Sequence, residues 1–214
     1  ALTANTTGTL NTAVGRSALA VNTTGYKMVA IGAYALDANT TGDNNVAVGY
    51  AALTANTTGG SNTAVGYNAM AVNTTGANNT AVGRLALDAN ITGARNVAVG
   101  NQACGGLDTS DNVGVGHYAL QATTTGSENV AIGSYAMQTN TAGTSNVAVG
   151  RYALQSNTTA DDNTAIGDTA LYDNTTGAEN TAVGKSAGAN ITTGHANTAI
   201  GRNSLTTATT GSGN

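Results

Sequence analysis

The sequence of 214 residues contains no proline, phenylalanine or tryptophan, and Cys104 is its single cysteine. Charged residues make up 8% of the chain and the net charge is −4. A lone cysteine excludes an internal disulfide. The absence of a basic patch disfavours nucleic acid as a partner. No apolar run approaches the roughly 18 residues of a membrane span, so we expect no membrane insertion in this segment.

Groups of residues that carry out chemistry are also missing. His117 and His195 are the only histidines, and neither shares a motif with a serine or cysteine nucleophile. No cluster of carboxylates or histidines has metal-ligand spacing, and Asp161 and Asp162 are interpreted as a solvated turn. We therefore expect no metal site, no cofactor and no enzymatic activity.

What the chain does contain is a repeat. An aliphatic residue followed by glycine recurs every 17 residues, with one interval of 16 between Val99 and Val115. The consensus is N-[TV]-A-[VI]-G-x-x-A-L-x-x-N-T-T-G-x-x. β-Branched residues at fixed places and the low net charge argue against a disordered low-complexity chain.

The repeat is too short for a pair of helices, and its β-branched residues and glycines are poor helix formers. It predicts two short strands per coil, joined by turns whose N-T-T-G glycine has positive φ. Ser110 and Ala160 replace that glycine in two copies. We expect an all-β parallel β-solenoid, or β-roll, as one domain over residues 1–214. It would have about 12–13 coils, an irregular coil at 100–111, and be a segment of a longer chain.

The strand pattern also predicts which side chains form the core. Thr63 and Val65 lie on one face of a strand and Ala64 lies on the other. We expect Val65 and Met70 in the core, Ala64 in a close-approach column, and a neighbouring chain covering one strand face. Two large apolar side chains per coil contribute roughly 1.5–3 kcal/mol each when buried. Ordering costs about 1.5 kcal/mol per residue, which favours a homo-oligomer with a shared core.

Tyrosines recur at one position of three successive copies. Tyr118, Tyr135 and Tyr152 are predicted to stack as a ladder. This ladder is the candidate surface-binding site, for a sugar or another surface, and ordinary edge packing is the alternative interpretation.

Threonines recur at the N-T-T-G turn, and they form the alternative ladder of Thr24, Thr41, Thr58 and Thr75. Such a ladder is the basis of a second functional hypothesis, ice binding. Adjacent threonines at a turn point in different directions, unlike T-x-T on a strand, which weighs against this hypothesis.

Asparagines of the same turns match the N-x-[ST] acceptor pattern, and the glycan candidates are Asn22, Asn39, Asn56 and Asn73. Turn chemistry explains these asparagines without a glycan.

Two further positions have simple interpretations. Arg151, Asp168 and Lys185 follow the strand glycine in successive copies and predict a solvated row with modest ion pairing. Cys104 replaces the leucine of the Ala-Leu pair and is predicted to be a buried filler.

The segment from Asn78 to Leu87, N-N-T-A-V-G-R-L-A-L, resembles the head repeats of trimeric autotransporter adhesins, the YadA-like family. It departs from the family signature N-S-V-A-I-G-x-x-S at Asn79, Thr80, Val82 and Ala86. The chain also resembles repeats of phage and bacterial tail-fibre-like proteins. The resemblance covers the whole chain and implies a left-handed β-roll and a homotrimer. It implies a place at the cell or virion surface, with a host-surface protein or glycan as partner.

The leading functional hypothesis is an extracellular structural or adhesive fibre segment, either an adhesin head or a tail-fibre-like spacer. The alternatives are the ice-binding solenoid and a self-assembling extracellular filament subunit.

Overall fold

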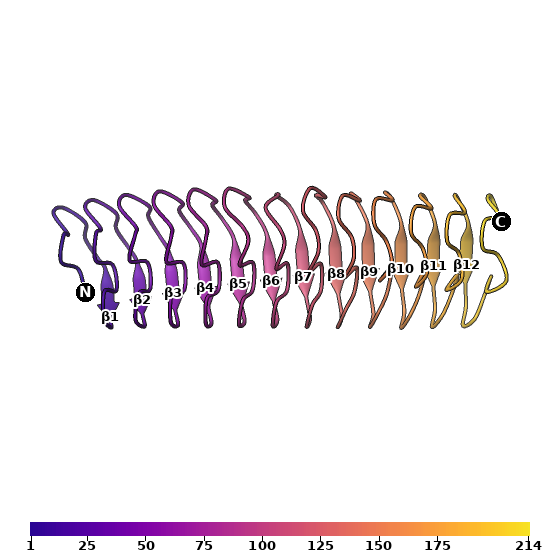
Figure 1. Ribbon diagram of the computed structural model, residues 1–214, viewed down its shortest axis with the longest axis horizontal. Helices are drawn as coiled ribbons and strands as arrows, with labels where there is room; N and C mark the ends of the chain where they lie inside the picture. The colour runs from indigo at the N-terminus through magenta and orange to yellow at the C-terminus, as the bar shows by residue number, and fades with distance from the viewer. The chain divides into compact units, whose positions relative to one another are not determined.

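The computed structural model describes residues 1–214 and is an all-β parallel β-solenoid with coils of about 17 residues. Each coil contributes one three-residue strand, and the chain has no helix, hence none that could cross a membrane (Figure 1). The strands are β1 (Thr12–Val14), β2 (Val29–Ile31), β3 (Val46–Val48), β4 (Thr63–Val65), β5 (Thr80–Val82), β6 (Val97–Val99), β7 (Val113–Val115), β8 (Val130–Ile132), β9 (Val147–Val149), β10 (Thr164–Ile166), β11 (Thr181–Val183) and β12 (Thr198–Ile200).

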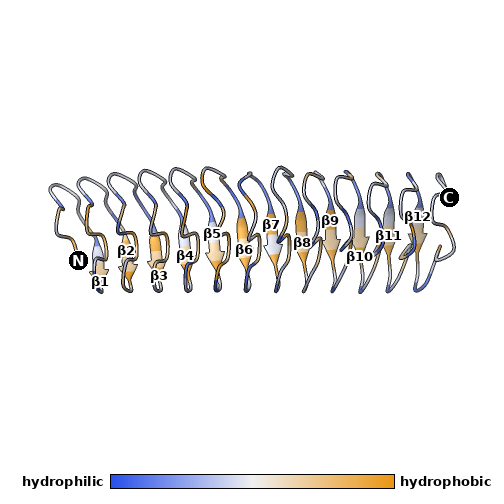
Figure 2. Ribbon diagram, viewed as in Figure 1, coloured by the Kyte–Doolittle hydropathy of each residue, from blue (hydrophilic) through white to orange (hydrophobic).

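The coils fall into two compact units, residues 1–110 and residues 111–214. In the first unit β1 to β6 pair in parallel, each with the next, and Ala47 lies opposite Ala64. In the second unit β7 to β12 do the same, and Ala165 lies opposite Ala182. Because identical positions pair, like side chains form columns along each unit. Figure 2 shows this as strands of hydrophobic colour, paler where the first residue is threonine, as in β10 and β11.

The predicted second strand is wrong, because the return half of each coil is a series of turns. Asn68 and Met70 have φ of 52° and 51°, and these two left-handed residues prevent an extended strand. The return segment still bonds to its neighbours along the stack: Met70 N donates to Ala86 O at 3.0 Å and Asn68 N donates to Tyr50 O at 3.0 Å. Each coil therefore has one strand, and inter-coil hydrogen bonds on both sides.

The prediction that the N-T-T-G glycine has positive φ is also wrong, and glycine is needed there for another reason. Gly66, which ends a strand, has φ of 140°, whereas the N-T-T-G glycine Gly76 is not in the positive-φ region. A Cβ at Gly76 would collide with the carbonyl oxygen of Gly93 in the next coil. Close approach of the backbones therefore selects glycine at the turn. At the strand end glycine is selected both by the backbone conformation and by close approach, because a Cβ at Gly66 would collide with the carbonyl oxygen of Gly83.

The interior of each coil is narrow and made of small residues. Ala64, Ala69 and Met70 are fully buried, so the alanine face of the strand points inward onto the Ala-Leu (here Ala-Met) pair. Val65 is only half-buried and lies on the outside of the coil, which corrects its prediction as a core residue. Alternation along the strand forces this result, because Ala64 and Val65 are on opposite faces.

Two buried asparagine ladders run through the coils. The turn asparagine ladder consists of the asparagines of N-T-T-G: Asn56 Nδ2 donates to Asn39 Oδ1 at 2.8 Å and to Gly59 O at 2.9 Å. The strand-start asparagine ladder consists of the asparagines that precede each strand: the backbone N of Asn163 donates to Asn146 Oδ1 at 3.0 Å. Burial of these amides is tolerated because neighbouring coils satisfy them.

The short coil at 100–111 is repaired by one carboxylate. In an ordinary coil the carbonyl oxygen of the first turn threonine accepts amides from the preceding coil; Thr74 O accepts from Thr57, Thr58 and Gly59 at 2.9, 3.3 and 3.4 Å. In the short coil Asp108 Oδ1 occupies that role.

Asp108 Oδ1 accepts the amides of Ile91, Thr92 and Gly93 at 2.8, 2.7 and 3.2 Å. Burial raises the pKa of Asp108, but the hydrogen bonds from these amides outweigh it and hold that pKa below its usual value. Thr109, and not Ser110 as predicted, takes the place of the turn glycine, since its carbonyl accepts from Asn96 Nδ2 at 2.6 Å.

In two coils a small residue stands at the core leucine position and a large apolar residue stands at the position of the turn asparagine. In the second unit Gly188 replaces the core leucine and Ile191, fully buried, replaces the turn asparagine; a Cβ on Gly188 would lie 3.1 Å from Ile191 Cδ1. In the first unit Cys104 and Leu107 stand at the same two positions, and both are buried. The predicted burial of Cys104 is confirmed.

Candidate functional site

The largest repeated surface is the outer strand face, which we define as the first and third side chains of every strand. In the first unit Ile31 and Val82 are 40% and 36% exposed, and in the second unit Ile132 and Ile166 are 41% and 40% exposed. Their neighbours on the same face are valines and threonines. Each unit therefore carries a continuous, partly exposed apolar strip, a feature that commonly marks an interaction surface.

A tyrosine edge follows the strand glycine in the second unit. Tyr118 and Tyr135 stack with ring centroids 5.6 Å apart and an interplanar angle of 24°, and Tyr135 and Tyr152 stack at 5.1 Å and 15°. His117 packs edge-on against Tyr118 at 4.1 Å, and Arg151 Cζ lies 5.2 Å from the centre of the Tyr152 ring. The predicted tyrosine ladder is thus present as a stack.

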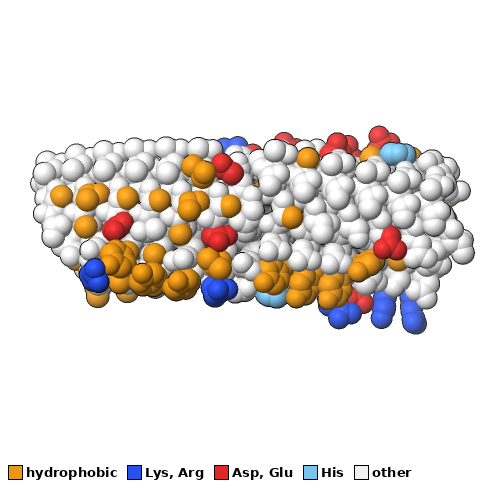
Figure 3. All heavy atoms as spheres, viewed as in Figure 1, with side chains coloured by type: hydrophobic (Ala, Val, Ile, Leu, Met, Phe, Trp, Pro, Cys, Tyr) orange, Lys and Arg blue, Asp and Glu red, His pale blue; other side chains and the backbone are white.

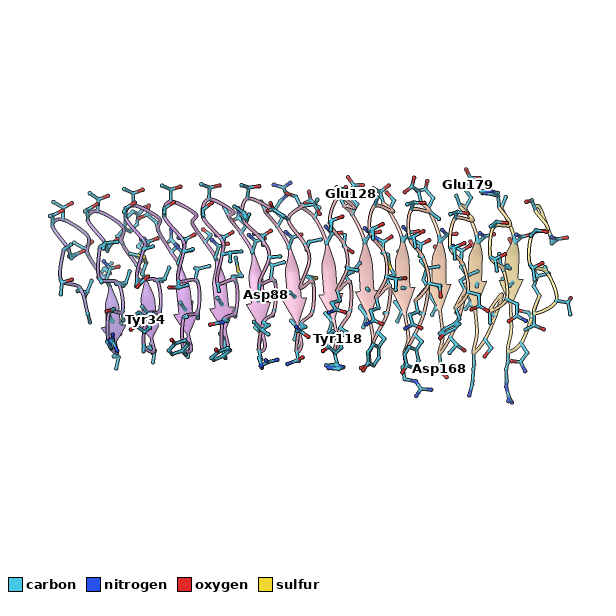
Figure 4. The ribbon with its side chains drawn as sticks, in the orientation of Figure 1. Tyr34, Asp88, Tyr118, Glu128, Asp168 and Glu179 are labelled. Atoms are coloured by element: carbon cyan, nitrogen blue, oxygen red, sulfur yellow. The ribbon has the colours of Figure 1, made fainter.

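The first unit has its own tyrosine edge. Tyr50 and Tyr67 stack at 5.5 Å and 11°, while Tyr34 meets Tyr50 edge-on at 5.8 Å. Arg16 Cζ lies 5.0 Å from the centre of the Tyr34 ring. Figure 3 shows hydrophobic side chains gathered along an edge of each unit, and Figure 4 labels Tyr34 in the first unit and Tyr118 in the second.

Ring orientation limits what such an edge can bind. Neighbouring rings face one another, so a stack leaves mainly ring edges and hydroxyl groups to solvent. A sugar that packs on an aromatic face needs a free face, whereas hydrogen bonding to a row of hydroxyls does not. Surface binding by Tyr118, Tyr135 and Tyr152 stays a prediction.

Most charged side chains of the second unit lie on two edges (Figures 3 and 4). Next to the tyrosines, Arg151 Nε pairs with Asp168 at 3.0 Å and Lys185 Nζ lies 3.8 Å from the same carboxylate, so the predicted ion pairing is confirmed. The hydrogen bond from Arg151 lowers the pKa of Asp168 and raises that of Arg151. The opposite edge, at the turn before each strand, is acidic; its members are Asp111, Glu128, Asp161, Asp162 and Glu179.

The remaining predicted site residues lie in the turns. Thr24, Thr41, Thr58 and Thr75 are exposed and form one column. The threonine before each of them bonds along the stack, as Thr57 Oγ1 does to Thr74 O at 3.1 Å. One column of exposed threonines is therefore present, where an ice-binding strand would present two.

The four glycan candidates are wrong for the folded chain. Asn22, Asn39, Asn56 and Asn73 are fully buried members of the turn asparagine ladder. Their Nδ2 atoms donate within the coils, which leaves no room for a glycan.

No group of metal-binding residues and no pocket is present. His195 Nδ1 accepts the amide of Ala178 at 3.0 Å, and Asp161 Oδ1 accepts the amide of Thr144 at 2.7 Å. These side chains continue the inter-coil hydrogen bonding. The ring of His117 packs against tyrosine, and His195 bonds to Ser212 through its backbone, whose N donates to Ser212 Oγ at 3.0 Å.

Sequence reasoning missed Asp108 and the acidic edge. The replacement of N-T-T by L-D-T in the one copy that lacks a residue was the signal for Asp108. The signal for the edge was the accumulation of acids at the two positions before the strand-start asparagine.

Comparison with known proteins finds no matching family model, no similar curated protein and no similar solved structure.

Proposed function

We propose that this chain is a non-enzymatic segment of an extracellular structural or adhesive fibre at a cell or virion surface. Copies of it associate through their outer strand faces as a homotrimer wound with left-handed coils. The observation that carries the proposal is the half-exposed aliphatic column at the third strand position, which continues through every coil of each unit.

Two physical arguments support a second copy as the occupant of this face. Most coils bury only one large side chain in their own interior, such as Leu53 or Leu154, so their cores are thin; the coil of Met28 and Leu36 buries two. Covering Ile132 or Ile166 adds roughly 25 cal/mol for each Å² of apolar surface removed from water. Since the aliphatic column repeats at every coil, this gain accumulates along the stack.

The charged edges of the second unit favour a parallel arrangement. The outer strand face lies between the edge of Asp168, with which Arg151 and Lys185 pair, and the edge of Glu128 and Glu179. When parallel copies pack around a common axis, the basic edge of one copy meets the acidic edge of the next at the same level. Antiparallel face-to-face packing would bring like edges together, which is unfavourable.

The oligomeric mass in solution tests the association. We expect a trimer by sedimentation equilibrium, and Val149→Lys with Ile166→Lys should give monomers with unchanged circular dichroism. Thr159→Lys, on an exposed turn away from the strand, is the matched control and should stay trimeric. A monomeric parent chain would refute the association.

Adhesion is tested separately. Beads coated with the chain should be retained on surfaces that display host glycans or surface proteins, and retention should fall when the tyrosine edge is changed by Tyr118→Ala. A chain that forms trimers but shows no retention would be a spacer and not an adhesive head.

The exposed threonine column supports ice binding as a second candidate. Thr41 and Thr58 lie one coil apart with exposed side chains. A thermal-hysteresis measurement with ice-crystal imaging tests it: shaped crystals that disappear in Thr41→Val/Thr58→Val would support it, and round crystals at high concentration would reject it. Electron microscopy of the same sample would reveal indefinite filaments if the chain were a filament subunit.

A further inference from the structure

We infer that the stacked tyrosines are sites of oxidative cross-linking, in which a peroxidase with hydrogen peroxide joins Tyr135 to Tyr152, and Tyr50 to Tyr67, through their rings. This inference does not depend on the proposed function. It follows from how the coils place tyrosines and from where the other oxidisable groups lie.

The geometry brings equivalent ring atoms together. Tyr135 and Tyr152 are the most closely stacked pair, at 5.1 Å and 15°, and Tyr50 and Tyr67 are the most nearly parallel, at 5.5 Å and 11°. In a near-parallel pair that is related by one coil, the carbon beside the phenol oxygen on one ring faces its counterpart on the next. Rotation of both rings about their Cβ–Cγ bonds turns these edges toward each other, and this torsion is soft for tyrosine.

Competing oxidisable side chains are out of reach. The chain has no tryptophan. Cys104 and all three methionines, Met28, Met70 and Met137, are completely buried. By contrast Tyr50 and Tyr67 are each 50% exposed, and Tyr135 and Tyr152 in the second unit are partly exposed. A one-electron oxidant in solvent therefore meets tyrosine first.

The reaction is balanced by the peroxide alone. Each of two phenols gives up one electron and one proton, and hydrogen peroxide takes up both electrons and both protons to form two waters. The two phenoxyl radicals form one carbon–carbon bond between the carbons beside the oxygens. Each of those carbons then loses its hydrogen as a proton while the phenol oxygen regains one, so two hydrogen atoms in total leave the protein.

The stack also provides internal negative controls. Tyr34–Tyr50 and Tyr152–Tyr172 are edge-on pairs with interplanar angles of 80° and 82° and longer spacings of 5.8 and 6.3 Å. Their ring carbons are not superposed, so these pairs should couple much less. A cross-link between Tyr135 and Tyr152 closes a short loop between adjacent coils, which restricts the unfolded chain and should raise the thermal midpoint.

Peptide mapping after peroxidase treatment tests the inference. Cleavage of the denatured chain after lysine and arginine places Tyr135 in the peptide 96–151 and Tyr152 in the peptide 152–185. We expect these two peptides to be joined with loss of two hydrogen atoms, and the peptide 28–84, which holds Tyr50 and Tyr67, to lose two hydrogens internally. An equal mixture of ¹⁵N-labelled and unlabelled protein should give joined peptides of one isotope only.

Tyr135→Phe keeps the ring and its packing but cannot form a phenoxyl radical, so the joined peptide should be lost. Tyr172→Phe, in the peptide that holds Tyr152, is the matched control and should still give the joined peptide. Mixed-isotope peptides as the main product, a joined peptide that persists in Tyr135→Phe, or catechols as the only products would each overturn the inference.

Discussion

The two units use the same coil but keep different asparagine ladders intact. In the first unit the turn asparagine ladder is continuous from Asn5 to Asn90, where Leu107 ends it, and each Nδ2 after the first bonds to the asparagine one coil earlier; its members are Asn5, Asn22, Asn39, Asn56, Asn73 and Asn90. In residues 111–214 the strand-start ladder is the continuous one; its members are Asn112, Asn129, Asn146, Asn163, Asn180, Asn197 and Asn214.

Each unit also shows where its weaker ladder breaks. Met28 replaces a strand-start asparagine in the first unit, and its sulfur accepts from Asn39 Nδ2 at 3.3 Å. Ile191 ends the turn ladder in the second unit, which leaves Asn174 Oδ1 buried without a hydrogen bond. One satisfied polar column, together with the alanine and leucine columns, is therefore enough to hold a coil, and the second polar column tolerates interruption.

The largest effect should come from removing an asparagine inside a continuous ladder. Asn56→Ala in the first unit removes the donor to Asn39 Oδ1 and the acceptor of Asn73 Nδ2. Each buried polar group left unpaired costs about 1–3 kcal/mol, so the loss should be roughly 2–5 kcal/mol in urea unfolding. Asn174→Ala, at the broken end in the second unit, should cost about half as much. Equal losses would mean that ladder continuity contributes nothing.

The next effect concerns the repaired coil. Asp108→Ala removes the acceptor of three amides, and we expect a loss of roughly 1.5–3 kcal/mol. Thr141→Ala in the second unit is the matched control, because Thr141 accepts the corresponding amides through its backbone carbonyl and keeps it.

Folding lowers the pKa of Asp108, so its contribution is complete above the unfolded-state pKa. That contribution disappears as the pH falls through the folded-state pKa. Asp108→Asn keeps a neutral acceptor oxygen but cannot ionise, so the part of the stability that is lost in acid should be absent in this variant. If the free energy of unfolding depends on pH in the same way for the parent chain and for Asp108→Asn, the proposed role of Asp108 is contradicted.

A smaller effect is expected where core volume was exchanged. Gly188→Leu in the second unit introduces a side chain against Ile191 and Leu171, and overpacking of this kind costs about 1–3 kcal/mol. Adding Ile191→Asn restores the consensus of the other coils and should recover the loss, with a coupling energy of roughly 0.5–3 kcal/mol. Cys104→Leu with Leu107→Asn is the parallel cycle in the first unit. If the stability losses of the two single changes simply add in both cycles, the two positions do not compensate for each other in volume.

The smallest effect should be stabilising. The exposed position before the strand-start asparagine is left-handed in every coil; it is Asn44 or Asn78 in the first unit and Glu128 or Glu179 in the second. Asparagine adopts this conformation at less cost than glutamate, so Glu179→Asn should stabilise the second unit by roughly 0.5 kcal/mol. Asn78→Glu should destabilise the first unit by a similar amount in thermal unfolding. A shift of the same sign in both variants would show that charge, and not conformation, decides.

Much of the fold follows from the period of the repeat. Identical copies 17 residues apart place like residues opposite one another, which predicts the parallel register of Ala47 on Ala64 and the tyrosine stack. The inward direction of the alanine face was harder to foresee. Val65 is larger and more apolar than Ala64, and hydrophobicity alone places it inside.

The return half of the coil could not be predicted from residue preferences. Leucine and tyrosine rarely adopt left-handed φ, yet Leu53 and Tyr135 do so here because bonds to adjacent coils fix them. The role of Asp108, whose carboxylate accepts three amides, depends on the three-dimensional position of a missing carbonyl, and no local pattern encodes that position.

The in-register columns have a consequence for inheritance. Most side chains meet the same or a similar residue one coil away, so gain or loss of one whole 17-residue copy by recombination leaves most of these contacts chemically unchanged. The gene for such a chain can therefore change the number of coils in single steps without a new core having to be selected. Shifts of one residue, in contrast, survive only where a side chain such as that of Asp108 supplies the lost backbone group.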